Sequence, residues 1–464
     1  MELHKRRHLS RLGFSVWCLV CCSLLLLLHI TMSSILDSNL QTTPDIPRGR
    51  LKMLTDWDLI LGEDSQFLPG GQISCDRTHM RYDLCSVNGS TVRDPTTSTF
   101  YVVGPTTSAR PFLVEKIKPY PRKFEPFIMA QIKELTITSG PKCPLCQVRH
   151  HAPALVFSVG GYTGNFFHDF NDGFVPLFIT VNSIFPNQDF VLVISEVPDW
   201  WISKYIDLLN AFTTQPIVTL NDTSTHCFPS ATFGLISHGF MTINQTLMPN
   251  SNTFTHFRAL LEKAYSQNLS SDFVFPSSKF RPRLLLASRN GSLGRVIVNR
   301  DEVIKTIEDI GFEVIIFEPQ TNTSLRESYA LINSSHAMIG VHGAALTHSI
   351  FLRPGAVFMQ VVPIGVEWAS DAFFGRLGRG LNLEYIEYKI GVEESTLVEK
   401  YGNDSLLLKD PHGVQVKGNG GWPAEIMDIY LKEQNVKIDL ERFSACLKKA
   451  YKKAKQFMER EDQD

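Results

Sequence analysis

The stretch RLLLASRNGSLGRVIVNRDEVIKTIEDIGFEVIIFEP, residues 283–319, decides the fold that this sequence predicts. Its first part, RLLLAS, is typical of a buried strand, RDEVIKTIEDIG of a helix that ends at Gly311, and FEVIIFEP of a second strand. A strand, a helix and a second strand within about 30 residues are characteristic of a parallel, Rossmann-like sheet. The sequence therefore predicts an α/β fold here.

The same alternation continues toward the C-terminus and recurs more loosely before this stretch. SLRESYALINSS and HGAALTHSIFL have helical patterns, whereas AMIGV and AVFMQVVP are typical of strands. Between Ala154 and Leu220 a similar rhythm includes FVLVIS as a strand. Because 464 residues, 43% of them hydrophobic, are enough for two cores, we expect two Rossmann-like domains facing a cleft.

The N-terminal segment has the features of a membrane anchor. Residues 12–36 contain no carboxylate and no lysine, and basic residues precede them, which predicts a span with its N-terminus in the cytosol. The alternative is a cleaved signal peptide, whose apolar core is usually only about 7 to 15 residues. The expected organisation is a cytosolic tail (1–11), an anchor (12–36), a stem (37–74), an acceptor-side domain (75–275), a nucleotide-sugar-binding domain (276–420) and C-terminal helices (421–464).

Cysteines and glycosylation sequons indicate the compartment. Six cysteines follow the span, an even number that favours disulfides in an oxidising lumen, although the pair in CPLC is also compatible with a redox motif or half a zinc site. The disulfide candidates are Cys75, Cys85, Cys143, Cys146, Cys227 and Cys446. The Asn-x-Ser/Thr sequons after the span are Asn88, Asn221, Asn244, Asn268, Asn290, Asn322, Asn333 and Asn403. A net charge of −2 without a long basic block after the first dozen residues argues against nucleic acid binding.

A first group of ionisable residues lies in GGYTGNFFHDFNDGFVPLF, directly after the apolar run ALVFSV. His168 and Asp172, four residues apart, share one face of a predicted helix, with Asp169 beside them. Pro176 is expected to kink this helix or to begin a new one. A purely structural role is the alternative, in which the two acids favour the positive end of a helix and the histidine is a satisfied residue at the edge of the core.

Two further groups lie where predicted strands end. Arg289 and Arg295, after Ser288 in ASRNGSLGR, can form bidentate contacts with phosphate oxygens. In GVHGAALTHSIF, His342 and Gly343 precede a predicted helix beginning at Ala344, whose N-terminus would favour a pyrophosphate. Ligands bind beyond the C-terminal ends of parallel strands, so the three groups together predict a nucleotide site.

These motifs, with HCFP between them, resemble plant members of glycosyltransferase family 61 over roughly residues 75–450. Within the family the chain is most similar to the xylan arabinosyl- and xylosyltransferases of grasses, and less so to the N-glycan β-1,2-xylosyltransferase. The resemblance implies a GT-B-type fold, a UDP-sugar donor, inversion at the anomeric carbon and a type II Golgi membrane protein. His348 departs from the family pattern, which often has asparagine there.

Carried onto this chain, the resemblance places the donor phosphates at Ser288, Arg289, Arg295, His342, Gly343 and Ala344, and the acceptor at His168, Asp169 and Asp172. We expect Asp169 to be the base, with His168 orienting or replacing it. No credible metal motif is present, because DWD lies in the stem, so a metal-independent transfer of a pentose, xylose first, to xylan is expected. The alternatives are transfer of arabinofuranose, N-glycan xylosylation and a catalytically inactive carbohydrate-binding protein.

Overall fold

The computed structural model describes residues 72–103, 113–139, 143–267, 280–289, 294–416 and 424–461. The predicted tail and anchor and nearly all of the predicted stem lie outside these residues, as do the sequons at Asn268 and Asn290. Among the helices that are described, none combines the length and the apolar character needed to cross a bilayer.

Within the described residues, ten strands form the first sheet, which is mixed rather than purely parallel. Its main strand order is β4-β5-β3-β2-β10-β7-β8-β9. The strands are β1 (Gln72–Asp76), β2 (Leu84–Asp94), β3 (Thr99–Val102), β4 (Val114–Ile117), β5 (Leu135–Thr138), β6 (Val148–Arg149), β7 (Ala154–Ser158), β8 (Val191–Ser195), β9 (Val218–Thr219) and β10 (His226–Phe233). The strands β10-β7-β8-β9 are mutually parallel, whereas β2 pairs antiparallel with β10. The Rossmann-like expectation therefore describes only the second half of this lobe.

Apart from one short helix between β4 and β5, the helices of the first lobe follow strands of its parallel part. They are α3 (Pro126–Gln131), α4 (Phe166–His168), the π-helix η1 (Asp169–Phe174), α5 (Val175–Ile184), α6 (Asp199–Phe212), η2 (Gln245–Leu247) and α7 (Phe254–Tyr265). Phe167, Phe170, Phe174, Leu177 and Phe178, which recur at three- and four-residue intervals, are buried. Pro176 lies at the start of α5, directly after the π-helical η1, and the backbone stays helical across this junction.

The second lobe is the parallel sheet that the opening stretch predicts. Within the described residues, five strands lie in the order β12-β11-β13-β14-β15, all parallel. They are β11 (Arg283–Ala287), β12 (Glu313–Phe317), β13 (Ala337–Val341), β14 (Val357–Val362) and β15 (Glu384–Lys389). Leu285 lies opposite both Ile315 and Met338. The order changes direction at β11, with β12 on one side and β13 on the other.

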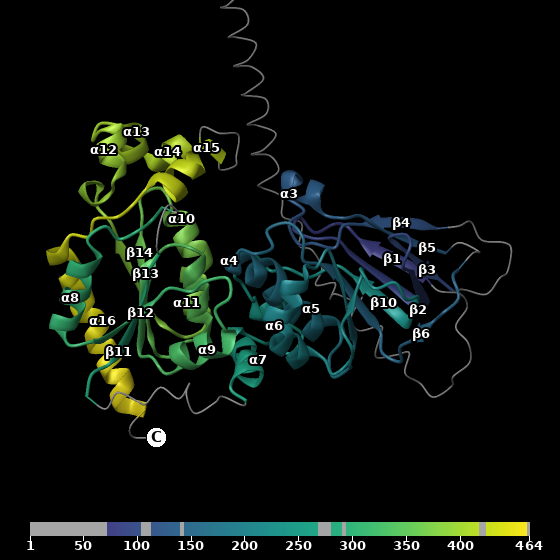
Figure 1. The fold of residues 1–464 in the computed structure, drawn as a ribbon. Helices are drawn as coiled ribbons and strands as arrows, with labels where there is room; N and C mark the ends of the chain where they lie inside the picture. The colour runs from purple at the N-terminus through teal and green to yellow at the C-terminus, as the bar shows by residue number, and fades with distance from the viewer. Residues whose placement is uncertain are drawn as a thin grey trace, which may run out of the picture. The chain divides into compact units, whose positions relative to one another are not determined.

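Helices cover both faces of this sheet (Figure 1). They are α8 (Arg300–Ile310), α9 (Leu325–Asn333), the 3₁₀ helix η4 (Ala344–Phe351), α10 (Glu367–Ala369), the π-helix η5 (Ser370–Gly375), α11 (Arg376–Gly380), η6 (Val392–Glu394), α12 (Leu397–Tyr401), α13 (Leu406–Lys409), α14 (Pro411–Val416), α15 (Ala424–Asp428), η7 (Ile429–Glu433) and α16 (Leu440–Glu461). Leu284 and Leu286 pack in one core with α8 and α16, whereas Leu285 and Ala287 pack in another with α9 and α11. Because successive side chains of β11 point to opposite faces of the sheet, the strand contributes apolar side chains to both cores. This explains why its sequence is a continuous apolar run.

Two disulfides join described cysteines, Cys75 with Cys85 and Cys146 with Cys227. The expectation that all six cysteines form disulfides is wrong for Cys143 and Cys446, which are free thiols in the structure. Cys146 is bonded to a cysteine 81 residues away, so CPLC is not a disulfide of its own.

The described sequons differ in accessibility. Asn88, Asn221, Asn244, Asn322 and Asn403 are exposed. Asn333, the last residue of α9, is only partly exposed, and its side-chain carbonyl accepts a hydrogen bond from Arg258.

Candidate functional site

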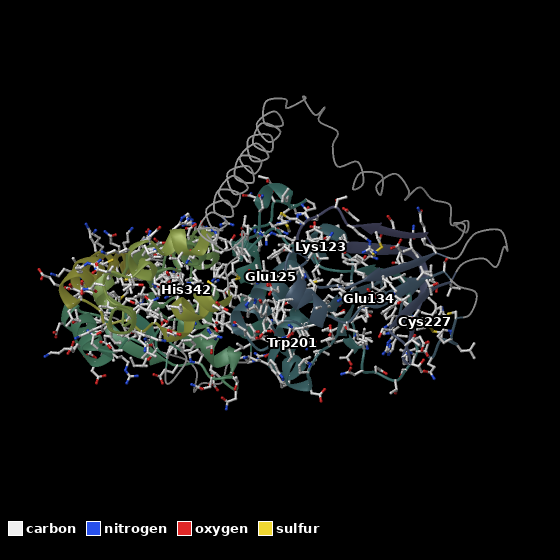
Figure 2. The ribbon with its side chains drawn as sticks, turned by 90° about the horizontal axis from the view of Figure 1, so that it is seen from above. Lys123, Glu125, Glu134, Trp201, Cys227 and His342 are labelled. Atoms are coloured by element: carbon white, nitrogen blue, oxygen red, sulfur yellow. A yellow bond between two sulfur atoms is a disulfide. The ribbon has the colours of Figure 1, made fainter. Side chains whose placement is uncertain are left out.

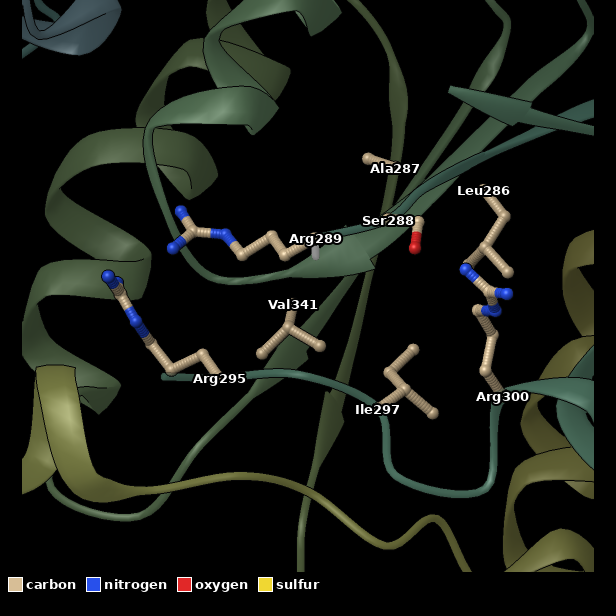
Figure 3. A pocket seen from close by; sticks show the side chains of 8 residues that line it. All are labelled: Leu286, Ala287, Ser288, Arg289, Arg295, Ile297, Arg300 and Val341. Carbon is tan, nitrogen blue, oxygen red and sulfur yellow. The ribbon is translucent and has the colours of Figure 1, made fainter. Parts of the chain in front are cut away.

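Two arginines lie at the C-terminal end of β11, in a pocket that Ser288 and Val341 also line. Figure 3 shows the side chains of Arg289 and Arg295 extending in the same direction, whereas Arg300 lies apart from them in the pocket. Arg295 donates from Nη1 to the carbonyl of His342 at 3.1 Å, and its Nε is buried without a hydrogen-bond partner. Arg300 is committed to an ion pair with Glu318 at 3.1 Å.

No described carboxylate forms an ion pair with Arg289 or Arg295. Burial lowers the pKa of Arg289, and burial together with the nearby Arg289 lowers the pKa of Arg295 to about 9. Two neighbouring cations in a largely buried place repel each other and lose hydration, which is costly unless an anion joins them. Their arrangement is therefore that of a binding site for an anion with several oxygens.

His342 and Gly343 follow β13 and lie against these arginines. A Cβ at position 343 would come within 1.8 Å of Nη2 of Arg289, so only glycine allows the guanidinium to rest on the backbone here. Burial, with Arg295 and Arg289 nearby, lowers the pKa of His342 to about 3, so its imidazole is neutral. Its Nδ1 lies 3.1 Å from the hydroxyl of Ser370. Ala344 begins η4, which is 3₁₀ rather than the expected α-helix type.

On the first lobe, His168 and Asp172 form the pair that their spacing predicted. Nδ1 of His168 lies 2.8 Å from Oδ2 of Asp172. Tyr120 donates to the same carboxylate oxygen at 3.1 Å, and Arg122 donates from Nε to Oδ1 at 2.8 Å. Burial alone would raise the pKa of Asp172, but Arg122 and His168 outweigh it and lower the pKa to about 2.

The ionised Asp172 fixes the tautomer of His168. A carboxylate only accepts, so the 2.8 Å contact to Asp172 places a proton on Nδ1, although Nη2 of Arg122, which also only donates, lies 3.1 Å from the same nitrogen. In the neutral ring Nε2 then carries the lone pair. The ring is held in place by stacking on Tyr162, with the ring centres 4.1 Å apart. The π-helical turn lets His168 and Asp172 meet at the end of α4, and such turns are frequent at functional sites. The arrangement is that of a general base with an orienting acid.

Asp169 has a different position from the one we expected. Its Oδ1 accepts from Trp201 at 3.1 Å and its Oδ2 from Tyr205 at 2.8 Å, and the residue is 6% exposed. Figure 2 marks Trp201 within the first lobe and His342 in the second. Burial raises the pKa of Asp169, although both donors act in the opposite direction. Because both oxygens are held by α6, the geometry opposes the expectation that Asp169 is the base.

Aromatic contacts join the element that carries His168 to the second lobe. Phe167 lies 4.7 Å from Phe373 between ring centres, and Phe373 lies 6.1 Å from His342. Phe166 stacks on His348 at 4.0 Å, so the departure from the family pattern at His348 is a packing contact between the lobes. The two predicted groups are thus neighbours across one layer of aromatic rings.

Sequence reasoning missed the residues that complete the acceptor-side group. Tyr120, Arg122 and Glu125 lie in KPYPRKFEP, residues 118–126, which precedes His168 by more than 40 positions. Arg122 joins Glu125 at 2.5 Å and Asp172 at 2.8 Å. A clustering of charged and aromatic residues between prolines was the available signal, but nothing local links it to the later motif.

Comparisons with known proteins agree on one family. The model of the family described as Glycosyltransferase 61 matches residues 164–359. The chain is 39% identical to the xylan glycosyltransferase MUCI21 of Arabidopsis thaliana, over 82% of this chain and 80% of that protein. It is 32% identical to the β-1,2-xylosyltransferase XYXT1 of Oryza sativa subsp. japonica, over 87% of this chain and 89% of that protein.

A third relative differs in the sugar that its name gives. The α-1,3-arabinosyltransferase XAT3 of Oryza sativa subsp. japonica is 35% identical over 82% of this chain and 65% of its own length. The match thus extends well beyond the segment 164–359 and includes both lobes. On this evidence the chain belongs to glycosyltransferase family 61 and is a glycosyltransferase.

Proposed function

We propose that this protein is an inverting glycosyltransferase that transfers a pentose, xylose first, from a UDP-sugar to xylan. The names of the relatives support xylan as acceptor and a pentose as the transferred sugar. Two lobes with a parallel β-sheet region each, and candidate groups at the carboxyl ends of their strands, support a GT-B-type arrangement with the donor on the second lobe.

The observation that carries the proposal is the pair of arginines without carboxylate partners at the end of β11. Arg289 and Arg295 offer two planar, positively charged groups to the diphosphate of the donor. The same contacts become stronger as the bond to the anomeric carbon breaks and negative charge gathers on the leaving diphosphate. Fixed cations can thereby supply the charge that a divalent metal supplies in other transferases, so we propose metal-independent transfer.

His168 is the proposed base. Nε2 removes the proton of the acceptor hydroxyl, the hydroxyl oxygen bonds to the anomeric carbon, and the electron pair of the broken C–O bond leaves on UDP. The proton then resides on the imidazole, where Asp172 stabilises the positive charge through the 2.8 Å contact. Asp169 supports this apparatus by tying η1 to α6.

The compartment is also a proposal. Two disulfides and exposed sequons suit an oxidising secretory lumen, and we propose a Golgi enzyme anchored as a type II membrane protein. A segment outside the described residues, 12–36, would be the anchor.

The decisive experiment incubates the purified lumenal part with labelled UDP-xylose and, separately, UDP-arabinofuranose, with xylan as acceptor. Transfer from UDP-xylose, with inverted linkage by NMR, supports the proposal. Transfer from UDP-arabinofuranose alone would assign the chain to the alternative activity that the name of one relative favours. Absence of transfer and of donor hydrolysis, in protein that binds xylan, would identify a carbohydrate-binding protein instead.

A further inference from the structure

A further cation without an ion pair to a described carboxylate lies on the His168 side of the site. Arg81 belongs to the loop between β1 and β2, and its guanidinium carbon lies 4.8 Å from the ring centre of Phe240 and 5.0 Å from that of Phe124. Arg122 rests on the same Phe240 ring at 5.2 Å and contacts His168 at 3.1 Å. No carboxylate in the described part of the chain forms an ion pair with Arg81.

The charged side chains around Arg81 and Arg122 include more cations than carboxylates. Arg122 is satisfied by Asp172 and Glu125. Arg376, at the start of α11 on the second lobe, is exposed and also has no ion pair with a described residue. Burial lowers the pKa of Arg81, and the positive charges of Arg122 and Arg376 lower it further. Arg81 and Arg122 share the Phe240 ring, and the two carboxylates Asp172 and Glu125 are both paired with Arg122, which leaves the charge of Arg81 for a ligand.

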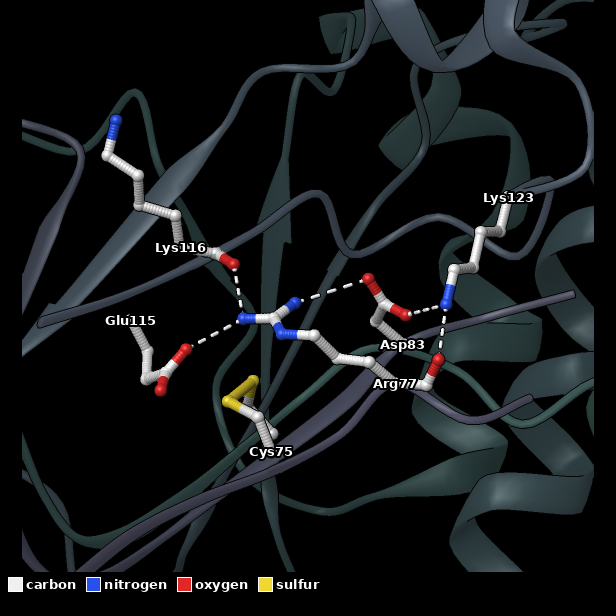
Figure 4. The surroundings of a disulfide bond; sticks show 7 residues. Cys75, Arg77, Asp83, Glu115, Lys116 and Lys123 are labelled. Atoms are coloured by element: carbon white, nitrogen blue, oxygen red, sulfur yellow. Dashed lines mark hydrogen bonds and ion pairs between the residues drawn. A yellow bond between two sulfur atoms is a disulfide. The ribbon is translucent and has the colours of Figure 1, made fainter. Parts of the chain in front are cut away.

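The loop that carries Arg81 is held rigidly (Figure 4). Its ends are joined by the disulfide Cys75–Cys85, and Lys123 donates its backbone N–H to the carbonyl of Arg81 at 2.9 Å. The side-chain pairs that brace it are Arg77–Asp83 at 3.2 Å, Arg77–Glu115 at 2.8 Å and Lys123–Asp83 at 2.7 Å. Arg77 and Lys123 are therefore paired with acids of the loop and of its neighbours, whereas Arg81 forms no ion pair with a described carboxylate.

Aromatic rings surround this charge on the face toward the second lobe. We call Phe124, Phe240, Phe373 and Trp368 the aromatic patch. Phe240 lies 5.8 Å from Trp368 and 5.2 Å from Phe373 between ring centres. Trp368 is 54% exposed. Exposed aromatic faces suit the apolar C–H faces of pyranose rings, so the patch is built for sugar rather than for a nucleotide phosphate.

The patch is separate from the pocket of the donor phosphates. None of its four rings lines the pocket of Arg289 and Arg295, and Phe373 lies 5.2 Å from Phe240 and 6.1 Å from His342 between ring centres. Arg289 and Arg295 already provide for the diphosphate. An anion bound at Arg81 is therefore a different group, on the side where His168 meets the acceptor.

We propose that Arg81 binds a carboxylate on the acceptor glycan, so that the preferred acceptor is a xylan chain bearing a uronic acid close to the site of transfer. The inference rests on the proposed function and extends it to the acceptor class. Arg81 is a specificity-determining residue in this scheme, with the aromatic patch stacking against the sugar ring that bears the acid.

The test compares two xylo-oligosaccharides of equal length, one neutral and one carrying a single glucuronic acid. The wild-type kcat/KM should favour the acidic acceptor by about tenfold or more, as a charge-assisted contact would give. Arg81→Gln should remove that preference and Arg81→Lys should keep part of it. Lys116→Gln, which removes a surface charge paired with Glu134 on the same lobe, should leave the preference unchanged. Circular dichroism confirms that each variant is folded.

Calorimetry measures the affinity of the protein for each oligosaccharide in the presence of UDP, so this second measurement does not depend on turnover. If neither is glycosylated, the proposed function fails, but the ratio of their affinities in wild type and Arg81→Gln still decides the present inference. Equal affinities in the wild type, or a ratio that Arg81→Gln does not change, would overturn it. If Arg81→Gln changes only the affinity for UDP-glucuronic acid relative to UDP-xylose, Arg81 binds a carboxylate of the donor. That result would also overturn the proposal.

Discussion

Replacing Asp172 with asparagine tests the acceptor-side group most directly. The side chain keeps its shape but loses the charge that faces Nδ1 of His168 at 2.8 Å and Nε of Arg122 at 2.8 Å. Without that charge the imidazolium formed during transfer is less stable, and the histidine is no longer held in one tautomer. General-base catalysis contributes about 10²- to 10⁴-fold, so turnover should fall at least a hundredfold while UDP affinity stays nearly unchanged.

The stability cost follows from the same contacts. Breaking a buried ion pair by removing one partner costs about 3 to 5 kcal/mol, and Arg122 keeps Glu125 at 2.5 Å, so we expect about 3 kcal/mol. In the wild type, the pKa of Asp172 is lowered from 3.8 to about 2. Its ionisation therefore adds about 2 kcal/mol of stability at pH values above 4, and this contribution is lost as the pH falls toward 2.

Asp169→Asn is the matched control, because it also alters a buried acid of η1. Both Trp201 and Tyr205 lose a charged acceptor, and one of them faces the new NH2 group and has no acceptor, so the change should cost about 1 to 3 kcal/mol of stability. Its turnover, measured at a temperature where both variants are folded, should stay within a few-fold of the wild type. Urea denaturation gives stability, and transfer of labelled xylose gives the rate. If Asp172→Asn is as active as the wild type, or if Asp169→Asn is the slower of the two, the assignment of His168 with Asp172 is wrong.

Four further predictions concern the donor pocket, the metal requirement and the surface. Arg289→Ala and Arg295→Ala should each weaken UDP binding by about 1.5 to 3 kcal/mol, measured by calorimetry, and an unchanged affinity would remove these residues from the phosphate site. Gly343→Ala should weaken UDP binding similarly, since its Cβ would displace the guanidinium of Arg289; full affinity in a folded variant would contradict this. Activity should persist in EDTA, and a loss that Mn²⁺ restores would show a metal requirement. Asn333 should carry little glycan compared with Asn221, because its amide is engaged at the end of α9; glycopeptide mapping that finds both equally occupied would argue otherwise.

Much of the second lobe was predictable because its signals are local. The apolar run of β11, the helix ending at Gly311 and the strand β12 all follow from periodicity and from one glycine with φ of 121°. Parallel topology then places the residues after β11 and β13 at one edge, which is why Arg289 and His342 could be assigned to a common site.

The first lobe was predicted less well for a physical reason. Its sheet is completed by strands from residues 72–138, which pair antiparallel at β2 and β10 over more than 130 positions of sequence. Such pairing depends on tertiary packing and leaves no short-range pattern. The expectation that all six cysteines form disulfides was wrong for Cys143 and Cys446 for the same reason. A count of cysteines does not show which sulfur atoms lie close together in the fold.

The sequence by itself determined the family, the alternation of strands and helices and the His168–Asp172 pair, since each depends on neighbouring residues or on spacing along one helix. The tertiary structure alone decided which distant side chains surround each of the two acids. Asp169 and Asp172 are three positions apart, but the wide turn of η1 directs one to Trp201 and Tyr205 and the other to Arg122, His168 and Tyr120. Partners so distant in sequence set the burial and the charge around each carboxylate, and these two quantities determine what each can do.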